Sequence, residues 1–507
     1  MHSPGGCAQP AACRPLDHPD WRTSCRSLSR YHAASLNATQ ATSFGSFVPA
    51  WKSSATALDV GRPFVPSLTR NLSIACGLVA SGAGLSRAIA GEQASFTLSL
   101  LRNFTSSDGA AFYVRLTGPA VLAGSVERLN GTAWQISYTA WDPGQYVLEL
   151  ILEYSHNVYA GPWKTDFVGG ACYCRQCCSR ADVDRNRYEG YHVAGSPFIV
   201  VVGPHESVAL PRRPCNPHRV VDSGRWVLCS GQTGLVPFTE ANWCWRTATC
   251  TRLAVEMFTP RALASCATKQ RKRIVLIGDS VMREQATSMK RLISDNNTWT
   301  VVFVPFFNGV TAPGMLGRLR KIAIAERVEC QRQHSLVVFN AGAHDAYTRM
   351  YGRVHFPLQY KTLSEFSVSA YATAMSQARD ILETMGAHQL VFRTTTALWL
   401  KYGTSYDFNH RQPKDKGLTI HQQRFGEGHN VARAMNEAVA PLFHLTNWSI
   451  VDGYAPTLSR PDGQADPLHP GPSLLAPMNA QILELVFWQL CHTTWREMNS
   501  VAGTSVA

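Results

Sequence analysis

The sequence lacks any apolar run long enough to form a membrane-spanning helix. Its best candidate, residues 72–85, is short and rich in Gly, Ala and Ser, so it predicts buried or loop structure. The beginning of the chain also lacks a basic stretch followed by an apolar core, the pattern of a secretory signal peptide. No membrane anchor is visible, and we expect any leader or anchor to lie outside this sequence.

Signatures of several common enzyme classes are absent as well. The chain has no His-Glu-x-x-His motif, no phosphate-binding loop and no dinucleotide fingerprint, so the sequence does not indicate a metalloprotease, an NTPase or a dehydrogenase. The nucleophile elbow Gly-x-Ser-x-Gly is missing, because Met282 stands at its second glycine position. Cysteines cluster at 172–178 and could hold zinc with His192, but no second Cys-x-x-Cys pair follows at zinc-ribbon spacing. A disulfide-linked loop is the favoured interpretation, and no metal site is predicted.

The composition is that of a folded protein with several domains. The chain has 507 residues, of which 45% are hydrophobic and 10% aromatic, enough to bury two or three cores. The formal net charge is +13, with basic residues concentrated at 269–273 and 318–332. No nucleic-acid-binding module accompanies this charge. A solvated basic surface is favoured, followed by contact with an anionic glycan or membrane, and no nucleic-acid partner is predicted.

Cysteines and glycosylation sequons indicate the compartment. The chain has 15 cysteines, a number that suits an oxidising environment. Asn-x-Ser/Thr sequons, the acceptors of N-glycosylation, occur at Asn37, Asn71, Asn103, Asn130, Asn296 and Asn447. We therefore expect a secretory-pathway protein of the Golgi or the extracellular space. The odd cysteine count implies at least one free or intermolecular thiol.

Hydrophobic patterning divides the chain into four segments. Residues 1–90 are rich in Ser, Ala, Pro and Cys and predict a poorly ordered lead segment. Short alternating runs within 91–203 predict a β-sandwich, interrupted by the insertion with clustered cysteines. Its strands are expected at 95–100, 111–116, 134–138, 146–150 and 195–202. Residues 204–270 are a linker and a lead-in rich in Cys and Trp, and residues 271–495 form a further domain.

This last domain alternates strand and helix patterns. Strands are expected at 274–278, 300–306, 335–340, 390–394 and 448–452, and helices at 281–294, 315–330, 364–385, 429–445 and 474–490. Such alternation predicts an α/β/α domain with a mainly parallel sheet and ligands at the carboxyl ends of its strands. The chain as a whole is predicted to be multidomain, with a β-sandwich followed by this α/β/α domain.

Two motifs in this domain predict a catalytic site. Ser280 follows an apolar strand in Gly-Asp-Ser and opens a helix pattern, so its hydroxyl is exposed beside free helix N–H groups. Near the C-terminus, Asp466 and His469 form an Asp-x-x-His pair. A histidine can deprotonate the serine while an aspartate orients the ring. The two motifs together indicate acyl-ester chemistry through a covalent acyl-serine.

Two family resemblances extend this interpretation. Over roughly residues 94–203 the chain resembles a filamin-type immunoglobulin-like repeat, with matches at 141–146 and 192–198. The triad order looks like that of an SGNH (GDSL-type) hydrolase. Over residues 215–491 the chain resembles the PC-esterase families, which include trichome-birefringence-like and neurexophilin and PC-esterase domain proteins. The matching segments are the Gly-Asp-Ser-x-x-Arg-x-Gln signature at 278–285, the Cys/Trp lead-in at 215–250, and the blocks at 338–344, 390–395 and 460–462.

The resemblance implies roles for further residues. Besides Ser280 it points to Gly309 and Asn340, and to His344 in place of an asparagine, as oxyanion or substrate-binding groups. His344 could donate a hydrogen bond when neutral or could be a satisfied structural histidine. Arg283, one helical turn after the serine, could bind a substrate carbonyl or form a surface salt bridge.

The expected function is O-acetyl transfer to, or removal from, a polysaccharide or glycoprotein glycan. No bound cofactor is implied, although an acetyl donor such as acetyl-CoA would serve as a substrate. The alternative is a secreted or Golgi binding protein of weak catalytic ability, in which the β-sandwich contacts a glycan or a protein partner.

Overall fold

The computed structural model describes residues 78–205, 215–250, 272–348 and 359–490, each range with internal gaps, the longest at 155–190 and 400–427. The chain divides into two compact units, which we describe separately. The first consists mainly of the chain up to Val208, and the second mainly of Ala209 onward. The cysteine cluster at 172–178 lies outside the described residues, as do residues 1–77.

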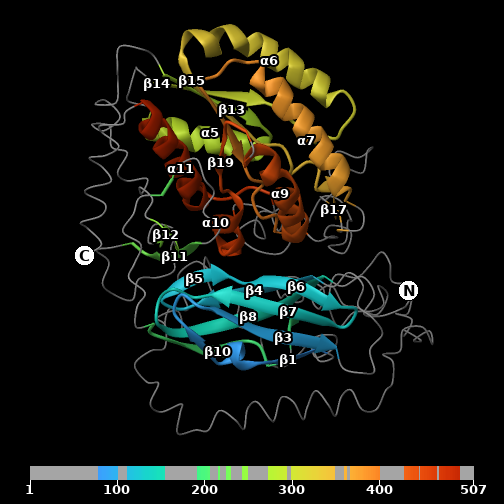
Figure 1. Cartoon of the computed structure of the whole chain (residues 1–507), viewed down its shortest axis with the longest axis vertical. Coiled ribbons are helices and arrows are strands. Elements are labelled where there is room, and N and C mark those ends of the chain that lie inside the picture. Colours follow the sequence, from blue (N-terminus) through green and yellow to red (C-terminus); the bar gives the residue numbers. More distant parts are fainter. Residues whose placement is uncertain are drawn as a thin grey trace, which may run out of the picture. The chain divides into compact units, whose positions relative to one another are not determined.

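The first unit contains two β-sheets. One has the strand order β1 (Leu78–Ser81), β3 (Gln93–Leu100), β7 (Ala133–Thr139) and β6 (Ser125–Asn130), with every pair antiparallel. The other carries, in order, β5 (Ala120–Ala123), β4 (Ala111–Thr117), β8 (Gly144–Tyr154), β10 (Phe198–Gly203) and β2 (Arg87–Ile89). The short β9 (Tyr191–His192) pairs with β8, and the 3-10 helix η4 spans Ala83–Leu85. In Figure 1 these strands run from blue (β1) through cyan (β8) to green (β10).

Alternating side chains build the core of this unit. Phe96 and Leu98 of β3 are buried, as are Trp134 and Ile136 of β7, while the residues between them are exposed or half-buried. Phe112 of β4 meets Trp134 edge-to-face, with ring centroids 4.8 Å apart, and this contact joins the two sheets. The two-sheet arrangement is the one expected for a β-sandwich.

Not every strand of this unit follows the alternation. The strands expected near 95–100, 111–116, 134–138, 146–150 and 195–202 are present as β3, β4, β7, β8 and β10. The strands β1 and β2 precede residue 91, where the sandwich was expected to begin, and both are short with Gly and Ser around them. β6 has no fully buried residue, so it carries no hydrophobic alternation to detect.

The second unit is built on a five-stranded, fully parallel sheet. Its strand order is β14 (Trp299–Pro305), β13 (Lys272–Gly278), β15 (His334–Phe339), β18 (Gln389–Arg393) and β19 (Trp448–Val451). All seven residues of β13 are buried, as expected for a strand covered on both faces. The predicted α/β domain with a mainly parallel sheet is confirmed.

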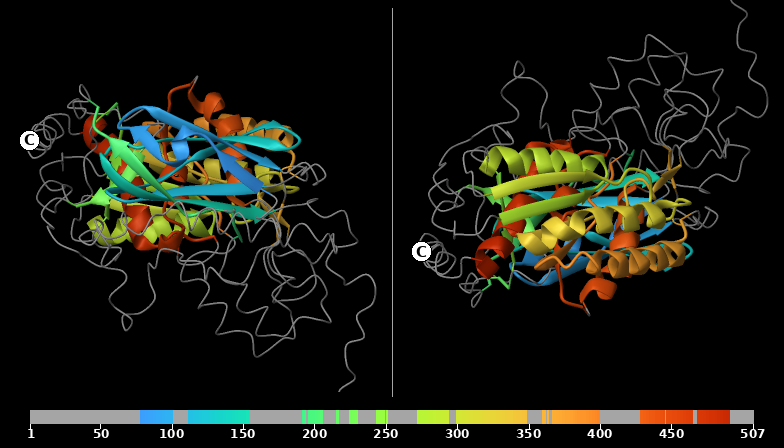
Figure 2. Two further views of the ribbon diagram at one scale, coloured as in Figure 1. Left: turned by 90° about the horizontal axis from the view of Figure 1, so that it is seen from below. Right: turned by 90° about the horizontal axis from the view of Figure 1, so that it is seen from above.

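Helices cover the two faces of this sheet (Figures 1 and 2). On one face, Ile274 and Leu276 of β13 pack with α5 (Ser280–Ile293) and α11 (Pro472–Leu490). On the other, Val275 and Ile277 pack with α6 (Met315–Arg332), α7 (Val368–Glu383) and α9 (Gly428–His444). The smaller elements are α10 (Tyr454–Leu458), the 3-10 helix η9 (Pro461–Gly463), and the pair β16 (Tyr347–Thr348) and β17 (Gln359–Tyr360).

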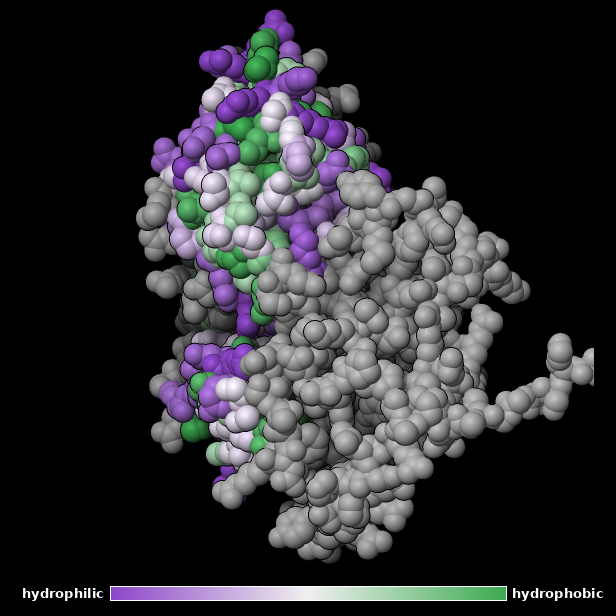
Figure 3. All heavy atoms as spheres, turned by 90° about the vertical axis from the view of Figure 1, so that its right-hand side faces the viewer, coloured by the Kyte–Doolittle hydropathy of each residue, from purple (hydrophilic) through white to green (hydrophobic). Residues whose placement is uncertain are grey.

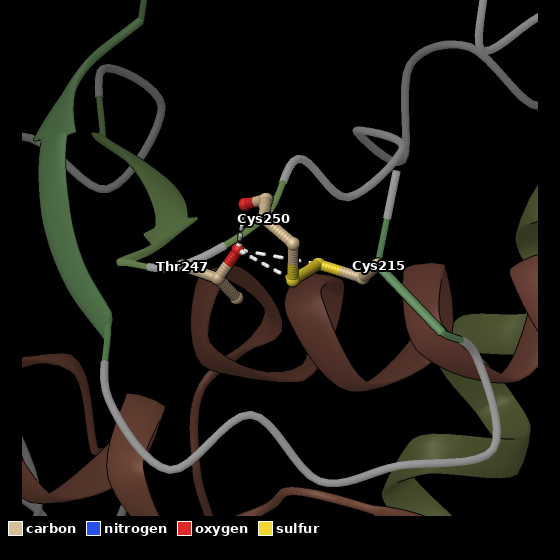
Figure 4. Close-up of a disulfide and its surroundings, with 3 residues drawn as sticks. All are labelled: Cys215, Thr247 and Cys250. Atoms are coloured by element: carbon tan, nitrogen blue, oxygen red, sulfur yellow. Dashed lines mark hydrogen bonds between the residues drawn. A yellow bond between two sulfur atoms is a disulfide. The ribbon is translucent and has the colours of Figure 1, made fainter. Parts of the chain in front are cut away.

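The lead-in to this domain is a disulfide-linked hairpin of β11 (Gly224–Leu228) and β12 (Trp243–Thr247). One disulfide joins Cys229 to Cys244 across the hairpin, and another joins Cys215 to Cys250. The Thr247 hydroxyl donates a hydrogen bond to the Cys250 carbonyl oxygen at 2.5 Å and lies against the second disulfide (Figure 4). Two disulfides indicate folding in an oxidising compartment, secretory or extracellular.

The remaining cysteine of the described residues, Cys330 in α6, is a buried free thiol, in agreement with the odd cysteine count. Across the described ranges, we find no helix that is both long and apolar enough to span a membrane.

Candidate active site

Ser280 lies where β13 passes into α5. The strand ends at Gly278 and the helix begins at Ser280 itself, so the half-buried serine stands at the N-terminus of a 14-residue helix. Glycine is required at 278, because a Cβ there would lie 2.3 Å from Cγ of Met282 and 2.7 Å from the Asn340 carbonyl oxygen. The tight passage from strand to helix therefore depends on Gly278.

His469 contacts Ser280 directly. Its Nε2 atom lies 2.7 Å from the Ser280 Oγ atom, although the two residues are 189 positions apart. Close to His469 in the chain, Pro470 forms an isolated bridge with Gln464, and the Gly471 N–H donates to Gly463 O at 2.9 Å. Asp466 lies outside the described residues.

Asp279, between the strand and the serine, is buried. Its Oδ1 atom accepts a hydrogen bond from the Val281 N–H at 2.9 Å, which fixes the first turn of α5. Within the described part of the chain, its Oδ2 atom is buried without a hydrogen-bond partner. The aspartate therefore braces the turn that presents Ser280.

A fully buried arginine lies under this turn. Arg393, the last residue of β18, donates from Nε to the Met282 sulfur at 3.1 Å and from Nη2 to Asn340 Oδ1 at 2.7 Å. Burial lowers the pKa of Arg393 to about 10, while Asp279 and Tyr371 act in the opposite direction. The guanidinium is therefore charged at neutral pH, with Asp279 as its nearby negative charge.

Asn340, an expected oxyanion donor, is buried in this same network. Its Nδ2 atom donates to the Arg393 carbonyl oxygen at 2.8 Å and lies 3.4 Å from Thr395 Oγ1. The amide thus holds the end of β15 against the end of β18. Its hydrogen bonds lie within the protein framework at the sheet edge.

Gly309, the expected backbone donor, follows β14. It is buried, and a Cβ at this position would lie 2.3 Å from Asp345 Oδ1. Asp345 accepts hydrogen bonds from the Val310 N–H at 2.8 Å and the Thr311 N–H at 3.0 Å. The loop after β14 is therefore fixed to the loop after β15 at the point where Gly309 lies.

Asp345 itself is almost completely buried. Burial raises the pKa of Asp345, and the hydrogen bonds from Thr311 and Val310 oppose this rise. The sequence alone indicates no role for Asp345. Its position directly after His344 was the available signal, and its partners lie 34 and 35 residues away.

His344 and Arg283 occupy different surroundings. The Nδ1 atom of His344 lies 2.6 Å from the Tyr347 hydroxyl oxygen, and the two rings are 5.1 Å apart. Arg283 has a side chain 52% exposed, and its Nη2 atom lies 3.3 Å from Glu284 Oε1. The structure thus joins Ser280 to His469 and the Gly309 loop to the Asn340–Asp345 loop, and it places Arg283 in a surface ion pair.

These groups share one edge of the sheet. Ser280 follows β13, Gly309 follows β14, and Asn340 follows β15, and these three strands are neighbours. The carboxyl ends of neighbouring parallel strands are the usual ligand-binding edge of an open α/β sheet. Among the residues that the structure describes, no group of three or more His, Cys, Asp or Glu could hold a metal ion.

No protein-family model matches the chain, and no curated protein matches it. Among solved structures, it is similar to the C-terminal catalytic domain of peptidoglycan O-acetyltransferase A from Streptococcus pneumoniae, with 12% identity, a TM-score of 0.25, and 44% of this chain and 95% of that chain covered. It is also similar to the Lin-41 filamin domain, with 13% identity, a TM-score of 0.16, and 25% and 91% covered. Similarities of this size do not bear on activity or substrate.

Proposed function

We propose that this protein is a serine acyl-ester enzyme with Ser280 as nucleophile and His469 as its base. The 2.7 Å contact between Ser280 Oγ and His469 Nε2 carries the proposal. It lies at the ligand-binding edge of the sheet and at the start of a helix. A serine hydroxyl hydrogen-bonded to an imidazole is the arrangement that activates it for attack on an acyl carbon.

In the first half of the reaction, Ser280 Oγ forms a bond to the acyl carbon while His469 Nε2 takes the hydroxyl proton. The tetrahedral intermediate collapses, the bond to the leaving group breaks, and His469 returns the proton to it. Asp466, three residues before the histidine in sequence, would orient the ring and stabilise its protonated form.

The negative charge on the tetrahedral oxygen needs fixed donors. The Ser280 N–H, at the first position of α5, and the backbone N–H of Gly309 are the groups we assign to this role. Asp345 supports the second of them, since its carboxylate holds the two N–H groups that follow Gly309. Preorganised donors of this kind need no rearrangement when the charge develops.

In the second half, a hydroxyl oxygen attacks the acyl carbon of the acyl-serine while His469 takes the hydroxyl proton. The bond between the acyl carbon and Ser280 Oγ then breaks, and His469 returns the proton to Ser280 Oγ. Water as the attacking group makes the protein an esterase, and a sugar hydroxyl makes it a transferase. The resemblance to the PC-esterase branch of SGNH hydrolases supports an acetyl group and a polysaccharide or glycoprotein glycan. An acetyl donor such as acetyl-CoA would then be a substrate, and the Golgi or extracellular space the location.

A fluorophosphonate probe tests the nucleophile. We expect covalent labelling of the wild type at Ser280, identified by mass spectrometry, and no labelling of Ser280→Ala. Ser288→Ala is the matched control, because Ser288 lies two turns along the same helix and bonds to Asn479 instead. A wild type that fails to label under both reducing and non-reducing conditions would refute the proposal and favour a binding protein.

Two assays then separate the enzyme classes. One supplies an acetyl donor with glycan and measures transfer, and the other supplies acetylated glycan and measures release of acetate. Ser280→Ala should lose whichever activity the wild type shows. An activity that survives this substitution would contradict the acyl-serine mechanism.

A further inference from the structure

A pocket of about 600 Å³ lies between the loop that joins β14 to α6 and the helix α7. Its volume falls within the range of small-molecule binding sites. One wall is formed by residues of the range 310–317, and the other by residues of α7 between Ser369 and Gln377. Both walls belong to the α/β unit.

The α7 wall carries a row of hydrogen-bonding side chains. Ser369, Thr373 and Gln377 are spaced four residues apart, so they lie on one face of the helix, and all three are exposed. Among the described residues, the side chains of Thr373 and Gln377 have no hydrogen-bond partner. This row therefore offers donors and acceptors to a ligand along two turns of helix.

The opposite wall is made of small and apolar residues. It includes Ala312, Pro313, Gly314 and Gly317, and the lining as a whole contains no Asp, Glu, Lys or Arg. A phosphate or carboxylate would find no opposite charge here. A long acyl chain would leave the hydroxyls and the amide of α7 without partners when they are covered. The lining thus selects an uncharged ligand with many hydroxyl groups.

Figure 3 looks onto the side on which α6 and α7 lie in Figure 1, and the described residues there mix hydrophilic, intermediate and hydrophobic types. We propose that the pocket binds an uncharged sugar unit of the acceptor glycan. This inference rests on the function proposed above, because it assigns a binding place to the acceptor whose hydroxyl would attack the acyl-serine.

The pocket is connected to the catalytic residues through the β14–α6 loop. Val310 and Thr311 line the pocket, and their N–H groups are bound by Asp345 directly after the proposed oxyanion donor Gly309. β14 is also the neighbour of β13, which ends at the Ser280 turn. A glycan seated in the pocket would therefore lie beside the loop that carries the proposed oxyanion donor.

Direct binding measurements test this pocket without requiring turnover. The probes are xylohexaose and maltohexaose, which are uncharged, and a chondroitin sulfate hexasaccharide, which is acidic, each titrated by calorimetry into the full chain. We expect at least one neutral probe to bind. Gly317→Trp should lower the affinity for this probe about tenfold or more. Gly317 lines the pocket and a Cβ there has nothing within 4 Å, so the indole ring would occupy the space of the ligand.

A second variant removes the polar row while keeping its shape. Thr373→Val combined with Gln377→Leu should lower the affinity for the neutral probe about tenfold, since the two hydrogen bonds expected from these side chains to the sugar are lost. The matched control is Ala325→Trp, because Ala325 is exposed on the same helix as Gly317 and does not line the pocket. It should bind as the wild type does, and circular dichroism should show all variants folded.

The possible results divide clearly. Binding of a neutral probe that both pocket variants weaken, and the control does not, supports the proposal. The absence of neutral binding, a preference for the acidic probe, or unchanged affinity in the pocket variants overturns it. Failure of the acyl-serine function would appear separately, as absent fluorophosphonate labelling in a protein that still binds the sugar.

Discussion

Arg393 and Asn340 share two hydrogen bonds, and each residue is the donor in one of them. The Arg393 guanidinium donates to Asn340 Oδ1 at 2.7 Å, and the Asn340 amide donates to the Arg393 carbonyl oxygen at 2.8 Å. Both residues are buried at the ends of neighbouring strands. Since β15 also pairs with β13, this exchange fixes the part of the sheet edge from which Ser280 emerges.

Replacing Arg393 by Met should therefore destabilise the domain strongly. The change leaves the buried Asn340 oxygen without its hydrogen-bond donor and removes the positive charge near buried Asp279, and each buried polar group left unsatisfied costs about 1–3 kcal/mol. Urea unfolding followed by tryptophan fluorescence measures this loss. The control Arg433→Met removes an arginine whose Nε atom lies 3.8 Å from Glu437, a partly exposed pair worth less than about 1 kcal/mol. Equal losses in the two variants would contradict a special role for Arg393.

Gly309→Ala tests the loop after β14. The added methyl would lie 2.3 Å from the Asp345 carboxylate, so the carboxylate must move away from the N–H groups it holds. We expect kcat/KM for the acetyl ester to fall about 10²-fold, the usual effect of losing one oxyanion donor. Gly317→Ala serves as the stability control, because its Cβ meets open space and should strengthen α6 by up to about 1 kcal/mol. Unchanged kcat/KM in Gly309→Ala would exclude this loop from the oxyanion site.

The Cys215–Cys250 disulfide should contribute to the stability of the domain. It closes a loop with a sequence separation of 35 residues, and chain-entropy arguments give about 3–4 kcal/mol for loops of this size. Changing both cysteines to Ser should lower the free energy of unfolding by this amount. Cys330→Ser is the control for loss of a buried thiol outside any disulfide. If dithiothreitol shifts the urea midpoint of the wild type and the double variant equally, this disulfide has no such effect.

His334 should make stability depend on pH. Burial lowers the pKa of His334, and nearby His388 and Lys272 lower it further. The folded protein therefore takes up this proton less readily than the unfolded chain, whose pKa is near 6.5. The contribution of His334 to the free energy of unfolding is complete above the pKa of the unfolded chain. It declines as the pH falls from there toward the lower pKa of the folded protein.

The variant His334→Phe should lose this pH dependence while keeping an aromatic ring next to His388. In the wild type, the ring centroids of His334 and His388 are 4.2 Å apart. Among the described residues, His334 Nδ1 is buried without a hydrogen-bond partner, so the substitution breaks no bond at that atom. Urea midpoints at pH 7.5 and pH 5.5 provide the measurement. A wild type whose midpoint falls no further than that of the variant would contradict the assignment.

The main-chain elements of the α/β unit were predictable because their hydrophobic signals are strong and local. β13 is a continuous run of buried residues, and α5 follows it with apolar residues at helical spacing. The expected helix at 281–294 differs from the observed Ser280–Ile293 by one residue at each end. The contact of Ser280 with His469 also has a sequence signal, since both residues stand in short recognisable motifs.

The supporting network could not be predicted in the same way. Arg393 ends an apolar strand, a position at which the sequence predicts an exposed arginine. Its hydrogen-bond partners Asn340 and Met282 are 53 and 111 positions away in the chain. Asp345 likewise gains its role only when the loop after β14 folds against it. Long-range polar pairs of this kind have no periodicity, so only the three-dimensional arrangement reveals them.

The hydrogen bond between Ser280 and His469 leads to the sharpest prediction, because a nucleophile and its base act as one unit. Ser280→Ala and His469→Ala should each remove nearly all turnover, and the double variant should be no slower than either single variant. Asp466→Asn should leave a weak residual rate, about 10⁴-fold below the wild type, because the ring is then oriented in the wrong tautomer. Rates of acetyl transfer and of acetate release measure these effects. If the two alanine effects multiply in the double variant, the residues act independently and the contact of 2.7 Å has another purpose. If Asp466→Asn is as active as the wild type, a different group orients His469.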